Sequence, residues 1–345
     1  MKAGPSAAPR PDSRIPVTVL TGFLGSGKTT LLKRLLSAPG VRNVAVLVNE
    51  VAEIGIDQRL LDPLADGVQL LENGCICCSV KEELRRSLLA LLDRPSSEGI
   101  SHVVIETTGL ADPAPILGTF ASDPMLKFHF RIGGIVTAAD CVNASSQLER
   151  FPECANQIAA ADRVVLTKTD IAGEDAIALA GALVTRLNPA AIVVSAAIGD
   201  SLLAEEFLGT SAANLDEAAR FCRLIAANLP AKRVFAQSAA LSDDVSETRA
   251  RPFCIAVDQS FDWSAFAVWL TMLLHAHGDK VLRVKGILNV AGSSTPVLIN
   301  GVHRLMHQPE HLPRWPDGDR RSIIVFIVAG MDPDVVRQSF DMLVT

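Results

Sequence analysis

The chain has 345 residues, which is long enough for two domains and for a core that needs neither disulfides nor metal to fold. Hydrophobic residues make up 49% and charged residues 20%, which excludes wholesale disorder, and the net charge of −6 disfavours a protein that binds nucleic acid. Seven cysteines are too few for a disulfide scaffold, and their odd number cannot pair fully within the chain, which favours a reducing compartment.

Residues 1–14 are rich in proline, alanine and serine and are expected to form a disordered tail. They contain no hydrophobic run of the kind found in signal peptides. No segment approaches the roughly 18–20 uninterrupted apolar residues that a membrane span requires. We therefore expect a cytoplasmic protein without a membrane partner.

Short β-branched runs alternate with helical stretches in the first part of the chain. The sequence predicts strands at residues 15–21, 44–49, 103–106, 163–167 and 191–195, and helices at 30–37, 81–92 and 174–187. This alternation predicts an α/β fold whose mostly parallel sheet is covered on both faces. We place this first domain at residues 15–215.

The character of the sequence changes after the first domain. Residues 216–251 end in a polar, serine- and aspartate-rich segment and are expected to form a linker region. Beyond it, the pattern predicts strands at 253–257, 281–290, 295–299 and 323–328, with helices at 263–274 and 332–343. Residues 252–345 are therefore expected to form a smaller α+β domain.

Residues 22–29 match the pattern G-x-x-x-x-G-K-[ST], directly after a predicted strand and before a predicted helix. The glycines allow the backbone to wrap a phosphate, and the N–H groups at the helix start face its negative charge. Lys28 is expected to reach the β- and γ-phosphates, and the Thr29 hydroxyl to hold Mg²⁺. The predicted phosphate-binding residues are Gly22, Gly25, Ser26, Gly27, Lys28, Thr29 and Thr30.

The tetrapeptide T-K-x-D at residues 167–170 ends a predicted strand and resembles the N-K-x-D box of GTPases. The Asp170 carboxylate can accept two hydrogen bonds from guanine, which adenine cannot supply, and the stem of Lys168 is expected to lie along the base. By itself such a tetrapeptide is also compatible with a solvated loop. Downstream of a phosphate loop, it predicts GTP as the substrate.

Glu106 to Gly109 close the strand predicted at residues 103–106. A carboxylate at this strand end would act through Mg²⁺ or on an attacking water. Gly109 is expected to offer its N–H to the γ-phosphate and to move when that phosphate leaves. Together with Lys28, Glu106 and Gly109 form the predicted catalytic set; a surface loop is the alternative.

Three of the seven cysteines, Cys75, Cys77 and Cys78, fall within four residues. Clustered thiols favour a soft-metal site for Zn²⁺, Cu(I) or Co²⁺, and three ligands would leave it open for metal transfer. Redox chemistry and structural packing are the alternatives. Glu50 and Glu53 lie between this cluster and the phosphate loop, and Glu50 is expected to contact Mg²⁺, with a solvated loop as an equal alternative.

The motifs at residues 22–30, 72–78 and 106–113 resemble those of the CobW family of metallochaperone GTPases, which are related to UreG and HypB. Residues 282–289 and 301–303 resemble the CobW C-terminal domain, so the resemblance covers nearly the whole chain after residue 14. It implies a P-loop GTPase domain, a smaller C-terminal domain, and GTP hydrolysis coupled to delivery of Zn²⁺ or Co²⁺. Thr167 departs from the family, which commonly has asparagine there to brace the phosphate loop.

The function expected from these residues is that of a GTPase that loads a divalent metal, with zinc favoured, from Cys75, Cys77 and Cys78 onto a client protein. Cobalt handling in cobalamin biosynthesis is one alternative. A non-catalytic, nucleotide-binding metal or redox sensor is another. Nucleic acid and membranes are not expected as partners, and a homo-oligomer stays open.

Overall fold

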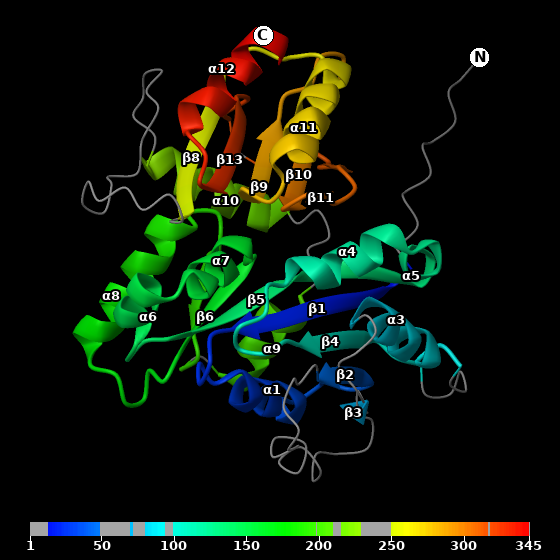
Figure 1. Ribbon diagram of the computed structural model, residues 1–345, viewed down its shortest axis with the longest axis vertical. Coiled ribbons are helices and arrows are strands. Elements are labelled where there is room, and N and C mark those ends of the chain that lie inside the picture. Colours follow the sequence, from blue (N-terminus) through cyan, green and yellow to red (C-terminus); the bar gives the residue numbers. More distant parts are fainter. Residues whose placement is uncertain are drawn as a thin grey trace.

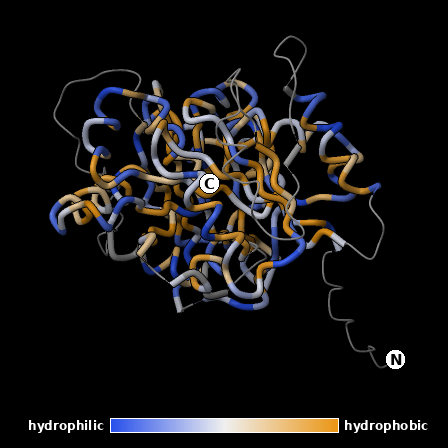
Figure 2. Tube along the Cα trace, turned by 90° about the horizontal axis from the view of Figure 1, so that it is seen from below, coloured by the Kyte–Doolittle hydropathy of each residue, from blue (hydrophilic) through white to orange (hydrophobic). Residues whose placement is uncertain are grey.

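The structure is a computed structural model that describes residues 13–48, 70–71, 80–93, 99–197, 199–209, 215–228, 250–316 and 318–344. It contains two β-sheets, one built from the first part of the chain and one from the last. The C-terminal sheet lies above the first sheet in the view of Figure 1, with helix α7 (Pro152–Ala160) between them. Hydrophobic segments run through the middle of the molecule (Figure 2).

The first sheet is entirely parallel, as the strand–helix alternation predicts, and its strand order is β3-β2-β4-β1-β5-β6-β7. Parallel strands buried on both faces read as continuous hydrophobic runs, which is why most of them are visible in the sequence. The strands are β1 (Ile15–Gly22), β2 (Val44–Val48), β3 (Leu70–Leu71), β4 (His102–Glu106), β5 (Phe130–Asp140), β6 (Arg163–Thr167) and β7 (Ile192–Ser195).

Helices cover both faces of this sheet. One face packs on α1 (Lys28–Ser37) and α9 (Asp200–Leu208), through residues such as Leu32 and Phe207. The opposite face packs on a larger group of helices. These are α3 (Val80–Ala90), α4 (Ala114–Ser122), α5 (Pro124–His129), α6 (Ala144–Arg150), α7 and α8 (Glu174–Leu187).

Strand β5 is the largest element of the first sheet that the sequence pattern did not predict. It lies beside β1, the strand that leads into the phosphate loop. Its first half contains Arg131 and the pair Gly133 and Gly134, and the pairing with β1 shifts register there, so no regular hydrophobic period is visible. Its second half is buried and ends at Asp140.

The C-terminal sheet is antiparallel, with the order β11-β10-β9-β13-β8 and β12 paired to β10. One face packs on α11 (Trp263–His277) and α12 (Pro333–Val344), the other on α10 (Leu215–Asn228). The predicted fold class, a parallel α/β domain followed by a smaller α+β domain, is confirmed. The strands are β8 (Ala250–Val257), β9 (Val281–Leu288), β10 (Val297–Val302), β11 (Leu305–Met306), β12 (Glu310–His311) and β13 (Ser322–Ala329).

Helix α10 lies almost entirely within residues 216–251, the stretch expected to link the two domains. Its buried side chains Phe221, Cys222 and Ile225 pack against the C-terminal sheet. The domain limits themselves stay a prediction. Among the described residues, no helix combines the length and hydrophobicity needed to cross a bilayer.

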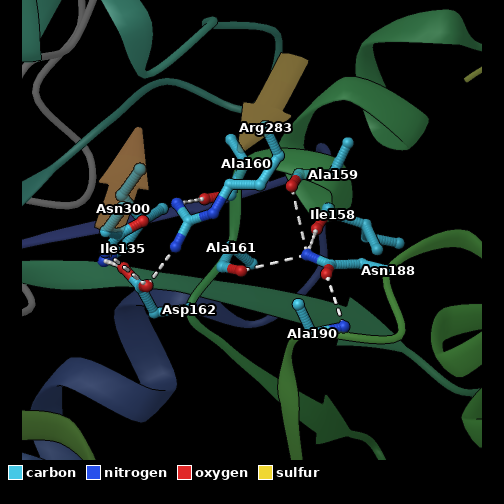
Figure 3. Close-up of polar contacts among 10 residues, drawn as sticks. All are labelled: Ile135, Ile158, Ala159, Ala160, Ala161, Asp162, Asn188, Ala190, Arg283 and Asn300. Atoms are coloured by element: carbon cyan, nitrogen blue, oxygen red, sulfur yellow. Dashed lines mark hydrogen bonds and ion pairs between the residues drawn. The ribbon is translucent and has the colours of Figure 1, made fainter. Parts of the chain in front are cut away.

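A buried ion pair joins the two sheets (Figure 3). Arg283 of β9 contacts the carboxylate of Asp162 and donates to the carbonyl oxygen of Ala160 at 2.7 Å. The other carboxylate oxygen of Asp162 accepts from the Ile135 N–H at 2.9 Å, and Asn300 approaches the first at 3.4 Å. Helix α7 and the strand that follows it are therefore fixed to the C-terminal domain.

Candidate nucleotide site

The phosphate loop connects the end of β1 to the start of α1, as the sequence predicts. Gly25 and Gly27 have φ of 68° and 87°, a left-handed conformation that side chains with a Cβ rarely adopt. Gly27 occupies the N-cap position of α1, and no side chain accepts a hydrogen bond from the first N–H groups of this helix. The first N–H groups of the helix therefore face the loop, which suits a bound anion.

Lys28, Thr29 and Glu106 meet beside this loop. The Lys28 Nζ donates to the carbonyl oxygens of Gly22 and Phe23, at 2.9 and 3.3 Å. The Thr29 Oγ1 lies 3.0 Å from the Glu106 Oε1, and Glu106 is only 5% exposed. Mg²⁺ prefers oxygen ligands such as hydroxyl and carboxylate groups. Because these two oxygens lie side by side, Thr29 and Glu106 fit the ion.

Ser26 and Thr30, two further predicted phosphate-binding residues, differ in their exposure to solvent. Ser26 is fully buried, and its hydroxyl has no hydrogen-bond partner among the described residues. Thr30 is exposed on the first turn of α1. The Ser26 hydroxyl is therefore enclosed within the loop, whereas Thr30 faces solvent.

The loop after Glu106 contacts the phosphate loop directly. The Thr107 N–H donates to the Leu20 carbonyl oxygen at 2.9 Å, and its hydroxyl donates to that of Thr21 at 2.9 Å. A Cβ on Gly109 would come within 2.7 Å of the backbone nitrogen of Leu24. Only glycine fits this approach, so the predicted γ-phosphate sensor is packed against the phosphate loop.

Thr167 braces the phosphate loop, although the family commonly has asparagine at this position. Its Oγ1 lies 2.6 Å from the Ser26 carbonyl oxygen and 3.1 Å from that of Ala139. The threonine that departs from the family therefore still contacts the phosphate loop, because its hydroxyl supplies the donor. This contact also joins the T-K-x-D segment to the phosphate loop.

Lys168 and Asp170 follow the brace at the end of β6. Lys168 adopts a φ of 56°, and its Nζ contacts the carboxylate of Asp140 at 2.8 Å. Burial raises the pKa of Asp140, but hydrogen bonds from Lys168, Asn143 and the Val142 N–H outweigh it and leave that pKa below its ordinary value. Asp170 is exposed. The lysine is thus held by a buried charge, while the aspartate faces solvent.

Sequence reasoning missed Asp140 and Gln157, which both contact the predicted site. Asp140 closes a buried strand next to the phosphate loop, as Glu106 does, so a hydrophobic run ending in an acid at 135–140 was the available signal. Gln157 donates to the carbonyl oxygens of Gly109 and Ala111, both at 3.1 Å. Nothing in its local sequence marks it, because both partners are far away in the chain.

The predicted metal ligands Cys75, Cys77 and Cys78, and the predicted Mg²⁺ ligand Glu50, lie outside the described residues. In the parts of the chain that are described, no three His, Cys, Asp or Glu side chains gather as a metal site would require. Burial raises the pKa of the Cys154 and Cys254 thiols to about 12. These scattered thiols stay protonated and are poor ligands for metal, since only the thiolate binds it well.

Two domains of known protein families match the chain. The sequence model of the CobW/HypB/UreG nucleotide-binding domain matches residues 16–195, and that of the cobalamin synthesis protein CobW C-terminal domain matches residues 250–344. The chain belongs to the CobW/HypB/UreG family. Its phosphate loop, the Glu106 loop and the T-K-x-D segment all fall within the nucleotide-binding domain of this family.

Individual CobW-family relatives match over almost their full length. The zinc chaperone YjiA of Escherichia coli is 36% identical, over 94% of this chain and 98% of the relative. The zinc chaperone CobW of a Sinorhizobium species is 27% identical, over 96% and 98%. The crystal structure of Zn(II)-bound YjiA GTPase from E. coli superposes with a TM-score of 0.66 at 27% identity, covering 96% of this chain and 99% of that one.

Proposed function

We propose that this protein is a GTP-hydrolysing metallochaperone that binds zinc at Cys75, Cys77 and Cys78 and transfers it to a client protein. The carrying observation is the contact of Thr167 with the Ser26 carbonyl oxygen, at 2.6 Å. It links the segment with the guanine-type tetrapeptide to the phosphate loop, as one nucleotide site requires. The relatives named zinc chaperones support zinc as the cargo, and one of them is a CobW, which favours zinc over cobalt.

In this proposal, Lys28 neutralises the β- and γ-phosphates and Asp170 selects guanine. Thr29 and Glu106 hold Mg²⁺, which when bound neutralises charge on the phosphate oxygens. The Gly109 N–H meets the γ-phosphate and is released when that phosphate leaves. The loop that contains Gly109 would therefore change its conformation according to whether GTP or GDP is bound.

Phosphate release from GTP and from ATP tests the proposal. Wild-type protein is expected to release phosphate from GTP and not from ATP. Lys28→Ala is expected to lower the rate by about 100-fold, since it removes a charge that stabilises the transferring phosphoryl group. Equal, slow release by wild type and Lys28→Ala would support a non-catalytic sensor instead.

A further inference from the structure

Helix α7 supports the loop that follows Glu106 through one side chain. Gln157 is only 1% exposed, and its Nε2 donates to the carbonyl oxygens of Gly109 and Ala111, both at 3.1 Å. Carbonyl oxygens only accept, so the amide nitrogen and not the amide oxygen must face the loop. One buried amide thus holds both sides of the turn at Gly109.

We propose that Gln157 is a positioning residue for GTP turnover, which holds the Gly109 turn in the form that meets the γ-phosphate. The inference rests on the proposed GTPase function. It assigns a role to a residue that hydrogen-bonds to the backbone of the loop and acts through it.

The rest of the loop is fixed at its two ends. Thr107 is bonded to the Leu20 carbonyl oxygen and to the Thr21 hydroxyl. At the other end, the Asp112 carboxylate accepts from the Ala114 N–H at 2.9 Å, where α4 begins. Between these ends, the Thr107 hydroxyl lies 3.2 Å from the Thr108 carbonyl oxygen, and the amide of Gln157 donates to the carbonyl oxygens of Gly109 and Ala111.

Gln157 is itself on a rigid support. Its carbonyl oxygen accepts from the Thr137 hydroxyl of β5 at 2.9 Å. Three residues further along α7, the Ala160 carbonyl oxygen accepts from Arg283 of the C-terminal domain at 2.7 Å. A positioning side chain is effective when its own backbone is held in this way.

The amide oxygen of Gln157 adds a second indication. It is buried and has no hydrogen-bond partner among the described residues. An unpaired buried acceptor destabilises a fold, and such groups are concentrated where function requires them.

Gln157→Leu tests this role through three measurements: phosphate release, affinity for GDP, and affinity for a slowly hydrolysed GTP analogue. We expect kcat and the preference for the analogue over GDP to fall by about tenfold, which corresponds to roughly 1.4 kcal/mol for the lost hydrogen bonds. GDP affinity should stay within about twofold, because the phosphate loop is untouched. Thr119→Val is the matched control, since Thr119 is only 4% exposed and its hydroxyl donates to the Pro115 carbonyl oxygen at 3.0 Å within α4, so the change removes a hydrogen bond that does not involve Gln157 or the Gly109 turn.

Gln157→Glu supplies a pH readout and a second variant if the leucine protein does not fold. A protonated carboxyl can donate to a carbonyl oxygen and an ionised one cannot, and burial raises its pKa. Turnover by this variant should therefore be retained at low pH and fall as pH rises, relative to wild type at each pH.

The inference is overturned if GDP and analogue affinities fall by the same factor in Gln157→Leu, if kcat is unchanged, or if Thr119→Val has the same effect. It is also overturned if Gln157→Glu follows the wild-type pH profile. A wild-type protein that releases no phosphate from GTP would overturn the proposed function first, so the two failures are distinguishable.

Discussion

At the scale of single residues, the predicted choice of base depends on Asp170. Its neighbour Lys168 is held at 2.8 Å by the buried carboxylate of Asp140, while Asp170 is exposed. Lys168 is thus held by a buried partner, whereas Asp170 faces solvent. The lysine is fixed before nucleotide arrives, and the aspartate is free to accept hydrogen bonds from a base.

Asp170→Asn should change the base preference. An amide can no longer accept both hydrogen bonds from guanine, and each charge-assisted bond contributes about 1.5–3 kcal/mol, so GTP affinity should fall by at least about tenfold. The amide instead matches the additional carbonyl of xanthine, so binding of xanthosine triphosphate should improve. Nucleotide titrations measure both effects.

Asp175→Asn is the matched control for that change. Asp175 is also exposed and lies in the first turn of α8, a short distance along the chain. It should leave both affinities unchanged. Identical behaviour of the two variants would contradict the assignment of guanine recognition to Asp170.

The nucleotide site could be predicted wherever its chemistry is contiguous in the chain. The phosphate loop carries its glycines, lysine and threonine within eight neighbouring positions, and the T-K-x-D segment is equally local. Gln157 lies 48 residues from Gly109, and Arg283 lies 121 residues from Asp162. No local pattern records such partners, because they are brought together only when the strands pair and the domains pack.

At the scale of elements, the central feature is the contact between two loops that leave neighbouring parallel strands. β1 and β4 are paired in register, with Leu20 opposite Glu106, so the loops after them start from the same edge of the sheet. Gly109 then packs on Leu24 of the phosphate loop. The geometry of the sheet therefore places the two loops together before any ligand binds.

Gly109→Ala should separate these loops. The new Cβ would lie 2.7 Å from the Leu24 nitrogen and 2.8 Å from its Cα, so backbone must move. We expect GTP affinity to fall by about 5- to 150-fold, since overpacking of this kind costs roughly 1–3 kcal/mol. Titration with a slowly hydrolysed GTP analogue measures it.

Gly181→Ala is the corresponding control in α8. A Cβ there would meet only the Leu166 Cδ1, at an ordinary 3.8 Å, and alanine in a helix interior is favoured over glycine. Nucleotide affinity should be unchanged and stability slightly raised. Full GTP affinity in Gly109→Ala would show that the loop contact does not matter for binding.

The same scale shows why some elements could not be predicted. Runs with a clear period, such as β6 and α8, match their expected ranges closely. β5 does not, because Gly134 interrupts its pattern. Gly134 has a φ of 157°, a backbone conformation that residues with a Cβ rarely adopt. The backbone geometry of this strand thus weakens its local sequence signal.

At the scale of the whole molecule, the two domains depend on the ion pair between Asp162 and Arg283. Both side chains are 1% exposed. Burial raises the pKa of Asp162, but the charges of Arg283 and Lys285 and the Ile135 N–H outweigh it, and that pKa lies well below its ordinary value. The pair therefore stabilises the fold above the ordinary aspartate pKa of about 3.9, and this stabilisation is lost as pH falls below it.

Arg283→Met should lower the free energy of unfolding at pH 7 by about 3–5 kcal/mol, because it leaves Asp162 buried with too little compensation. Arg304→Met is the control, since Arg304 and Asp279 form a pair at 2.8 Å in which both side chains are exposed. That variant should leave the free energy of unfolding nearly unchanged, because water screens an exposed pair. Urea denaturation measures both, and equal effects would contradict a structural role for the buried pair.

We propose that the bound nucleotide controls the affinity of the protein for zinc. The direct test of this control is the zinc affinity of the full chain in competition with a chelator, with a slowly hydrolysed GTP analogue or with GDP bound. We predict at least about tenfold tighter binding with the analogue, within the usual range of coupling between sites. Cys77→Ser should abolish stoichiometric zinc binding in both states while GTP affinity is kept. Equal zinc affinity with the two nucleotides would contradict the account.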